Sequence, residues 1–303
     1  MIDIQIEDMM NAGAHFGHQT KRWNPKMRPY LYGSRSGVHI IDLQKTKSLA
    51  VEALEFVTKQ VASGKNVLLV GTKPQAREII QREATRASMF YVTDRWMGGT
   101  LTNFQTIKKS IDRLIDLETR RENNDLEGYT KKEKLDIDRT IEKLLASLGG
   151  IKGMKGAPGI IFVVDPKQEH IAILEAKKLG IPVVAITDSN CNPDPIDYII
   201  PGNDDALSSI EYFTIKLADA CLAGLDKREA NTTQVYDEQR QGDKGKGRRG
   251  PRTRSVKGGD APNSYVSKTV QAQTFEGDAA GGFSAKTEVA ETPAAPVAES
   301  KGE

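Results

Sequence analysis

Three short apolar runs constrain the fold more than any other feature of the sequence. They read NVLLV at 66–70, GIIFVV at 159–164 and IPVVAI at 181–186. An uninterrupted apolar run of this length is typical of a strand that is buried on both faces of a parallel sheet. The first two runs are each followed by a helical pattern, at 74–87 and 166–180. Because strand, helix and strand at this spacing require right-handed crossovers, the sequence predicts a doubly wound α/β domain.

The other elements surround this alternation. The first 13 residues predict a leading segment and a short helix closed by Gly13, and residues 30–41 predict a hairpin around a Gly/Ser turn. The next helix is expected to begin after Asp42, a favourable N-cap residue, and to end at Gly64. Short strands at 89–92 and 197–202 and a helix over 204–224 complete the predicted domain.

Residues 100–149 interrupt the alternation because they contain no strand candidate. Apolar residues recur there at helical spacing in two series, Phe104, Ile107, Ile111 and Leu114, then Ile137, Ile141, Leu144 and Leu148. The polar segment ENNDLEGYT separates the two series and predicts a loop. We interpret the segment as an inserted antiparallel coiled-coil hairpin. Two ordinary helices packed on the sheet are the alternative.

The composition changes after residue 226. Residues 240–257 hold eight Lys and Arg against one Asp, and residues 261–303 are rich in Ala, Gly, Thr and Glu. Neither part can bury a core, so residues 227–303 are predicted to be a disordered tail and residues 1–226 the folded domain. The basic stretch is suited to bind RNA or another anion, and a solvated, solubilising tail is the alternative.

Some protein classes are disfavoured by simple features. No apolar run approaches the roughly 20 residues of a membrane helix, and the acidic N-terminus lacks the basic-then-apolar order of a signal peptide. We therefore expect a cytoplasmic protein with no membrane partner. Cys191 and Cys221 show neither C-x-x-C spacing nor a disulfide framework, which favours reduced, structural thiols.

Charge is distributed unevenly near the N-terminus. No Asp or Glu occurs over residues 11–41, although 28% of all residues are charged. This acid-free segment carries aromatic residues and five cations, Lys21, Arg22, Lys26, Arg28 and Arg35. Cations neutralise phosphates while flat rings stack on exposed bases, so the pattern favours a nucleic-acid contact. Pro25 and Pro29 are expected to keep the segment extended, and Trp23 either stacks on a base or packs on the domain.

His15 and His18 lie in the same segment and raise the question of a metal or catalytic site. At a spacing of three residues they could be ligands on one helical face, but Gly13 and Gly17 argue against a continued helix. No Cys or acidic residue lies nearby in the sequence to complete a metal site. We therefore interpret both histidines as packing or hydrogen-bonding residues that anchor the acid-free segment to the domain.

Carboxylates cluster after the last two strand candidates, at Asp188, Asp194, Asp204 and Asp205. Ligand sites of α/β domains usually lie at such strand ends. Together with a histidine of the acid-free segment, these groups could hold a structural divalent ion. The simpler interpretation, which we favour, has Asp194 in a turn while Asp204 and Asp205 cap the last helix. No cofactor is therefore predicted.

Two loops are further candidates for a contact with phosphate or RNA. The loop VGTKPQARE at 70–78 places Gly-Thr-Lys between a strand and a helix, where backbone N–H groups can bind phosphate, but it lacks the second glycine and the Lys-Ser/Thr of a P-loop. The loop DRWMGGTLTNF at 94–104 leads into the insertion, and we favour a structural junction there, since Gly98 and Gly99 allow a sharp change of direction. Arg95 is its best candidate for an RNA contact.

Three functions remain open from the residues alone. An RNA-binding protein agrees best with the acid-free segment. A phosphosugar- or nucleotide-binding enzyme would use residues 71–77, although the chain has no Ser-His-Asp order, G-x-S-x-G elbow or H-E-x-x-H zinc motif. An interaction module would act through the inserted hairpin.

Longer stretches of the sequence carry a family resemblance. GAHFGHQTKRWNPKMRPYLYGSRSGVHIIDLQKT, VGTKPQAR, DRWMGGTLTNF and PGIIFVVDPKQEHIAILEAKKLGIPVVAITDSNCNPDPIDYIIPGNDDA occur in this order. They resemble the second protein of the bacterial small ribosomal subunit, the ribosomal protein S-two family. The resemblance spans residues 1–225, is loose at 120–135 and does not include the tail.

The resemblance implies more than the residues do by themselves. Members are non-enzymatic parts of the small ribosomal subunit, with a flavodoxin-like, mostly parallel α/β domain and a protruding coiled-coil hairpin. They bind 16S ribosomal RNA and help to dock the messenger-RNA-binding ribosomal protein S-one. By position, the RNA contacts would be Lys21, Arg22, Trp23, Lys26, Arg28, Arg35 and Arg95. The protein-partner contacts would lie in the N-terminal stretch, at Met1, Ile4, Ile6, Met9 and Met10.

Overall fold

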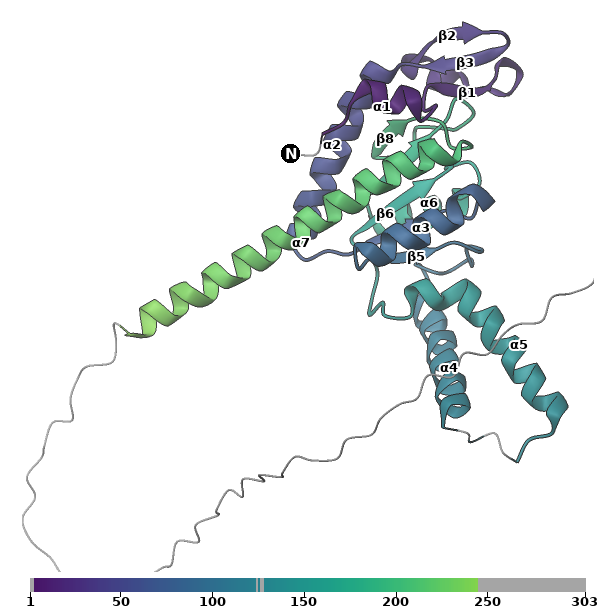
Figure 1. Ribbon diagram of the computed structural model, residues 1–303, viewed down its shortest axis with the longest axis vertical. Coiled ribbons are helices and arrows are strands. Elements are labelled where there is room, and N and C mark those ends of the chain that lie inside the picture. The colour runs from purple at the N-terminus through teal and green to yellow at the C-terminus, as the bar shows by residue number, and fades with distance from the viewer. Residues whose placement is uncertain (1–2, 124, 126–127, 245–303) are drawn as a thin grey trace, which may run out of the picture. The chain divides into compact units, whose positions relative to one another are not determined.

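A five-stranded parallel sheet forms the centre of the domain. The computed structural model describes residues 3–123, 125 and 128–244 (Figure 1). The strands are β4 (Val67–Val70), β5 (Phe90–Val92), β6 (Ile160–Val164), β7 (Val183–Thr187) and β8 (Tyr198–Pro201). Their order is β5-β4-β6-β7-β8, and every neighbouring pair is parallel. Counted within this sheet, the order is 2-1-3-4-5, which is that of flavodoxin-like doubly wound folds.

Helices cover both faces of the sheet, as the apolar strands predict. On one face lie α2 (Leu43–Ala62), α3 (Pro74–Arg86) and the first part of α7 (Leu207–Lys244). The other face is covered by α6 (His170–Leu179) and by the bases of two inserted helices. The side chains of β4 alternate between the two cores, since Leu69 belongs to the first and Leu68 and Val70 to the second. Within the described residues, no helix has the length and apolarity that a membrane span requires.

A second, small antiparallel sheet precedes the domain's central sheet. It contains β1 (Phe16–Gln19), β2 (Leu31–Arg35) and β3 (Val38–Ile41) in the order β1-β3-β2. The predicted hairpin is confirmed, and β1 is an addition to it. Ser36 and Gly37 both have positive φ angles, of 52° and 78°. Such a pair forms the tight turn whose twist matches two antiparallel strands.

The N-terminal stretch packs into the core instead of presenting all its apolar residues to a partner. The short helix α1 (Ile6–Asn11) is followed by Gly13, whose φ is +72°, as predicted. Ile4 and Met9 are 1% and 0% exposed and belong to the core beside α2 and α7. The prediction that these two residues contact a protein partner is therefore wrong, because the domain itself covers them.

The insertion between β5 and β6 consists of two helices, α4 (Phe104–Glu122) and α5 (Lys131–Leu148), as predicted. Their bases pack on the sheet through Ile107, Ile111 and Leu148, which corresponds to the alternative of two packed helices. The rest of the pair extends away from the sheet (Figure 1). Leu114 and Ile141, farther along the helices, are also buried. Coiled-coil winding of α4 around α5 stays a prediction.

The last helix is longer than the sequence suggested. α7 continues to Lys244, beyond the predicted boundary at residue 226, so residues 227–244 are helical and not disordered. This stretch has no proline and is rich in Lys, Arg, Glu and Gln, which have good helix propensity even without a core to cover. The rest of the predicted tail, with most of the basic stretch 240–257, lies outside the described residues.

Candidate nucleic-acid interface and the ion-pair centre beneath it

The acid-free segment lies over the loops that follow the central strands. β1 leads into two 3₁₀ turns, η1 (Thr20–Arg22) and η2 (Pro25–Tyr30). The expectation of a fully extended segment is therefore wrong for η2. Asn24 explains the turn, because its side chain accepts a 3.0 Å hydrogen bond from the backbone N–H of Lys26, and Pro25 supplies a suitable φ angle. Met27 is fully buried beneath η2 and fixes the turn to the domain.

Most of the predicted RNA-binding cations are available to an anion. Four of them, Lys21, Arg22, Arg28 and Arg35, are exposed, and none makes an ion pair within the described residues. Lys26 differs because it pairs with Asp194 at the surface. Asp194 lies in a turn, as predicted, and the ion pair gives it a second role.

Trp23 and Arg95, the other two predicted RNA contacts, have different surroundings. Trp23 is partly buried, and its ring centroid lies 5.0 Å from that of His39 on β3. Its packing on the hairpin is thus one of the two predicted outcomes. Arg95 is exposed in the loop after β5, at one edge of the central sheet. No hydrogen bond or ion pair in the described part of the chain joins Arg95 to the acid-free segment.

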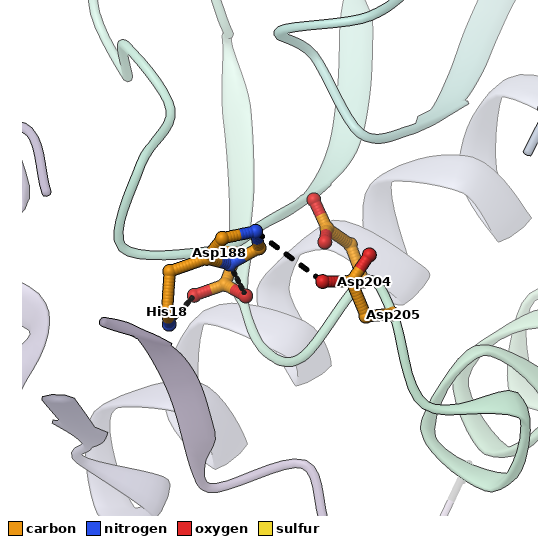
Figure 2. A group of neighbouring side chains, drawn as sticks. All are labelled: His18, Asp188, Asp204 and Asp205. Atoms are coloured by element: carbon orange, nitrogen blue, oxygen red, sulfur yellow. Dashed lines mark hydrogen bonds and ion pairs between the residues drawn. The ribbon is translucent and has the colours of Figure 1, made fainter. Parts of the chain in front are cut away.

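His18 connects the acid-free segment to the central sheet. Its Nδ1 lies 2.6 Å from Asp188 Oδ2, and its Nε2 lies 3.2 Å from Asp205 Oδ2 (Figure 2). Its backbone N–H donates to Ser189 Oγ at 2.9 Å. The interpretation of His18 as an anchor is therefore confirmed. The hydrogen bond with Asp188 raises the pKa of His18 above its ordinary value.

Gly17 makes this close approach feasible. A Cβ atom at this position would lie 2.9 Å from Ser189 Oγ and 3.2 Å from the carbonyl oxygen of His39. Real Cβ atoms do not tolerate the first distance, so any larger residue would push β1 away from the loop after β7. The sequence contains this glycine but does not reveal that its backbone lies close to Ser189 and His39.

Lys73 is the cation beneath His18. Its Nζ lies 2.8 Å from a carboxylate oxygen of each of Asp165, Asp204 and Asp205. Burial lowers the pKa of Lys73, but Asp204 and the other carboxylates raise it more, so the lysine stays charged. Asp204 and Asp205 thus bind Lys73 and His18, and the interpretation that they cap α7 is wrong. Asn203 instead accepts from the backbone N–H groups of Asp205 and Ala206.

The carboxylates of this ion-pair centre outnumber its cations. Within the described residues, the cationic groups that pair with Asp165, Asp188, Asp204 and Asp205 are Lys73 and His18. Burial, followed by repulsion from Asp165 and Asp188, raises the pKa of Asp204 to about 7. Asp204 Oδ2 is buried and has no hydrogen-bond partner in the described structure. A proton on Asp204 relieves this excess of negative charge near neutral pH.

A divalent ion could relieve the same excess. Ligand atoms of His18, Asp188, Asp204 and Asp205 all lie within 4.8 Å of one another. Nitrogen and carboxylate oxygen atoms are suitable ligands for zinc and related ions. Asp165, Cys191 and Asp204 form a neighbouring group, but burial raises the pKa of the Cys191 thiol, which disfavours the thiolate that metals bind. The divalent ion near Asp188 stays the alternative that the sequence left open beside the prediction of no cofactor.

The geometry disfavours the rival phosphate site at residues 71–77. Lys73 is the residue that would hold a phosphate, but it is 9% exposed and already bound by three carboxylates. An added phosphate would meet these carboxylates at close range, where like charges repel strongly. Thr72, in the same loop, donates to the buried Glu169. This loop therefore serves the ion-pair centre and the interior of the domain.

A buried carboxylate that the sequence analysis missed shapes the loop of Arg95. Glu175 on α6 accepts hydrogen bonds from the backbone N–H groups of Gly99, Leu101 and Thr102, at 2.7 to 3.0 Å. Trp96 Nε1 also donates to it. Burial raises the pKa of Glu175, but these hydrogen bonds lower it below its ordinary value. An acidic residue between Ala172, Ile173 and Ala176 on a buried helix face was the available signal.

Comparison with known proteins agrees with this architecture. The sequence model of the family described as "Ribosomal protein S2" matches residues 9–224. A protein of Maridesulfovibrio salexigens named small ribosomal subunit protein uS2 is 54% identical over 244 residues, which cover 80% of this chain and 94% of that protein. The protein of the same name from Geotalea uraniireducens is 56% identical over 224 residues, which cover 74% and 88%. That from Sorangium cellulosum is 55% identical over 226 residues, which cover 75% and 81%.

The α/β domain with its exposed basic segment is that of a structural, non-enzymatic ribosomal protein. Within that class, the chain belongs to the ribosomal protein S2 family. The resemblance found in the sequence is thereby confirmed, and the rival enzyme is set aside.

Proposed function

We propose that this chain is a structural constituent of the cytoplasmic small ribosomal subunit, where it binds 16S ribosomal RNA and so contributes to translation. The relatives that cover most of its length are named as small-subunit proteins. Binding rests on phosphate contacts and on the shape of folded RNA and not on reading base sequence.

The observation that carries this proposal is the set of exposed, unpaired cations on the acid-free segment. Lys21, Arg22, Arg28 and Arg35 have no acidic residue within their own segment and no ion pair elsewhere in the described structure. A cation without a protein partner has no ion pair to break when it binds phosphate. The anchors beneath them, Met27 and His18, hold the segment on the domain, so binding does not require it to fold.

Salt dependence tests the proposal. Each phosphate that the protein neutralises contributes about −0.7 to −0.9 to the slope of log affinity against log salt. The triple substitution Lys21→Ala, Arg22→Ala and Arg28→Ala should therefore weaken binding to 16S ribosomal RNA and make the slope less steep by about two. Filter binding between low and moderate salt measures both quantities.

A matched control removes three positive charges from the other end of the sheet, where the parallel strands begin. Lys59, Lys65 and Lys178 are exposed and lie near the N-terminal ends of the parallel strands, away from the acid-free segment. Their triple alanine variant should keep nearly the full slope. Equal losses in both variants would mean that net charge alone drives binding, and no loss in the first variant would contradict the proposed RNA interface.

We further propose that the N-terminal stretch supports docking of the messenger-RNA-binding ribosomal protein S-one. Met10 is 56% exposed and Ile6 is partly exposed, so both are accessible, whereas Met1 lies outside the described residues. Met10→Lys should reduce recovery of S-one with reconstituted small subunits. Leu179→Lys, at a position on α6 that is 45% exposed, should not. Equal S-one recovery for Met10→Lys and the unchanged protein would argue against this docking surface.

The two inserted helices are proposed to wind as a coiled coil beyond their bases. Leu114 and Ile141 are buried although they lie outside both cores of the central sheet, which supports a seam between the helices. Arg121 of α4 also pairs with Asp138 of α5 across this seam, at 3.9 Å.

A further inference from the structure

A cavity of about 350 Å³ lies beside the acid-free segment, and neither the ion-pair centre nor the exposed cations use it. Its size falls at the lower end of the roughly 300–1,000 Å³ that small-ligand sites span. Its lining comes from the segments after β6 and β7, from the first turns of α6, and from Asn24. Asn24 belongs to the acid-free segment, so the cavity is continuous with the proposed RNA interface.

The walls of the cavity are apolar and suited to a flat ring. Pro166 and Pro195 line it with rigid rings, and Ile173 and Leu174 of α6 line it with aliphatic side chains. Leu174 is 62% exposed, so it presents apolar surface beside the cavity. A planar, weakly polar group placed here would cover Leu174 and be held by dispersion contacts on its faces.

The cavity also presents hydrogen-bond donors. Asn24 Oδ1 accepts from Lys26 N, Asn190 Oδ1 from the Cys191 thiol, and Asn192 Oδ1 from Asp194 N. The local bonds therefore occupy the carbonyl oxygen of each amide. None of the three Nδ2 groups makes a hydrogen bond within the described residues. The three amides thus offer N–H donors to an occupant that carries acceptors on its edge.

The rim of the cavity is basic. Lys167 and His170 are exposed, and their side chains make no hydrogen bond or ion pair in the described part of the chain. They lie at the start of α6, where the backbone N–H groups also favour negative charge. An occupant with a flat, acceptor-bearing ring and an attached anion matches the walls, the donors and the rim together.

We propose that an unstacked nucleotide of the bound RNA inserts its base into this cavity and places its phosphate near Lys167 and His170. This inference rests on the proposed RNA-binding function and adds a second mode of contact to it. The exposed cations hold the backbone, while the cavity holds one base by its faces and acceptor edge. Since every base has acceptors, the site favours a nucleotide that is unstacked in the RNA over a particular sequence.

Blocking the cavity tests the proposal in the full-length chain. Leu174→Trp places a large ring over the cavity from an exposed position, so the fold is preserved, and affinity for 16S ribosomal RNA should fall about tenfold. Leu179→Trp, at an exposed position on the same helix but outside the lining, should bind like the unchanged protein. The salt slope should become less steep by at most about one in Leu174→Trp, because only the phosphate near Lys167 and His170 is lost, and it should stay the same in Leu179→Trp.

The results separate failure of this inference from failure of the proposed function. If Leu174→Trp binds RNA normally while the Lys21, Arg22 and Arg28 triple variant does not, the cavity proposal is overturned and the RNA interface stands. If neither variant binds RNA more weakly than the unchanged protein, both the cavity proposal and the proposed RNA interface are contradicted. If Leu174→Trp keeps its RNA affinity but reconstituted subunits lose a neighbouring protein, the cavity holds a protein segment instead.

A second measurement identifies the ligand chemistry. In NMR spectra, millimolar adenosine monophosphate should shift the side-chain amide signals of Asn24, Asn190 and Asn192, and these shifts should be absent in Leu174→Trp. Inorganic phosphate at the same concentration should leave the three amides nearly unchanged. Equal shifts with phosphate alone would reduce the cavity to an anion site and overturn the insertion of a base.

Discussion

Lys73 donates a 2.8 Å hydrogen bond to Asp204, although two further carboxylates lie at the same distance from its ammonium group. Lys73→Met should therefore destabilise the domain, because it leaves several carboxylates close together without their cation. Removing one partner of a buried ion pair typically costs about 3–5 kcal/mol. Proton uptake by Asp204 limits the loss, so we expect about 3 kcal/mol by urea unfolding at neutral pH.

The control is Lys65→Met, which removes an exposed lysine just before β4, at the end of the sheet where the parallel strands begin. It should change the free energy of unfolding by less than about 0.5 kcal/mol. Similar stabilities of the two variants would show that Lys73 does not neutralise the centre.

The stability of the domain should fall as the pH rises through neutrality. Asp204 has a folded pKa of about 7, raised chiefly by burial, and the hydrogen bond that His18 donates to Asp188 raises the pKa of His18. Each group binds a proton more tightly in the folded state, so its contribution is full below its unfolded pKa and is lost as the pH passes the folded pKa. We expect a loss on the order of 1–2 kcal/mol between pH 5.5 and pH 7.5, measured by urea unfolding.

Two substitutions isolate the source of this pH dependence. His18→Gln should be less stable than the unchanged protein at pH 5.5, and the difference should shrink toward pH 8. His170→Gln, which removes an exposed histidine, should follow the pH profile of the unchanged protein. An identical profile for His18→Gln and the unchanged protein would argue against His18 as a source.

The sequence indicated the central sheet because its strands are buried on both faces. Such strands need only uninterrupted apolar residues, as in β6 and β7, and no knowledge of their neighbours. Helix boundaries at residues such as Asp42 and Gly13 could also be predicted from the sequence, since a cap or a positive φ is a local property.

The ion-pair centre could not be predicted from the sequence, because it depends on residues that come together only in the folded domain. Lys73 and Asp204 lie 131 positions apart, and each has a plausible local role, as a phosphate ligand or as a helix cap. Ile4 and Met9 were assigned to a partner from the family resemblance, since the sequence of a short N-terminal segment does not reveal whether its own domain covers it. The roles of Lys73, Asp204 and Glu175 became visible only from their contacts.

Gly17→Ala should displace β1 from the loop after β7. The added methyl group would lie 2.9 Å from Ser189 Oγ, so the hydrogen bonds between His18 and that loop must lengthen. We expect a loss of about 1–3 kcal/mol in the free energy of unfolding. RNA affinity should also fall, because the acid-free segment would lose the anchor at His18.

Gly33→Ala provides the matched control for Gly17→Ala. It places the same methyl group in strand β2 of the same small sheet, where no atom lies within 4 Å of the added Cβ. This variant should match the unchanged protein in both stability and RNA affinity. Equal behaviour of the two alanine variants would show that the close approach at Gly17 has no energetic consequence.

The inserted helices should be held together by a few buried residues and not by their whole apolar content. Leu114 is fully buried, so Leu114→Ala should destabilise the helical pair by about 2–4 kcal/mol. Leu135 on α5 is 50% exposed, and Leu135→Ala should cost less than about 1 kcal/mol. Hydrogen exchange of the α4 and α5 amides measures this directly, because the helices can open without unfolding the sheet. If Leu114→Ala leaves their protection unchanged, the two helices do not share a seam, and the coiled coil proposed for this insertion is incorrect.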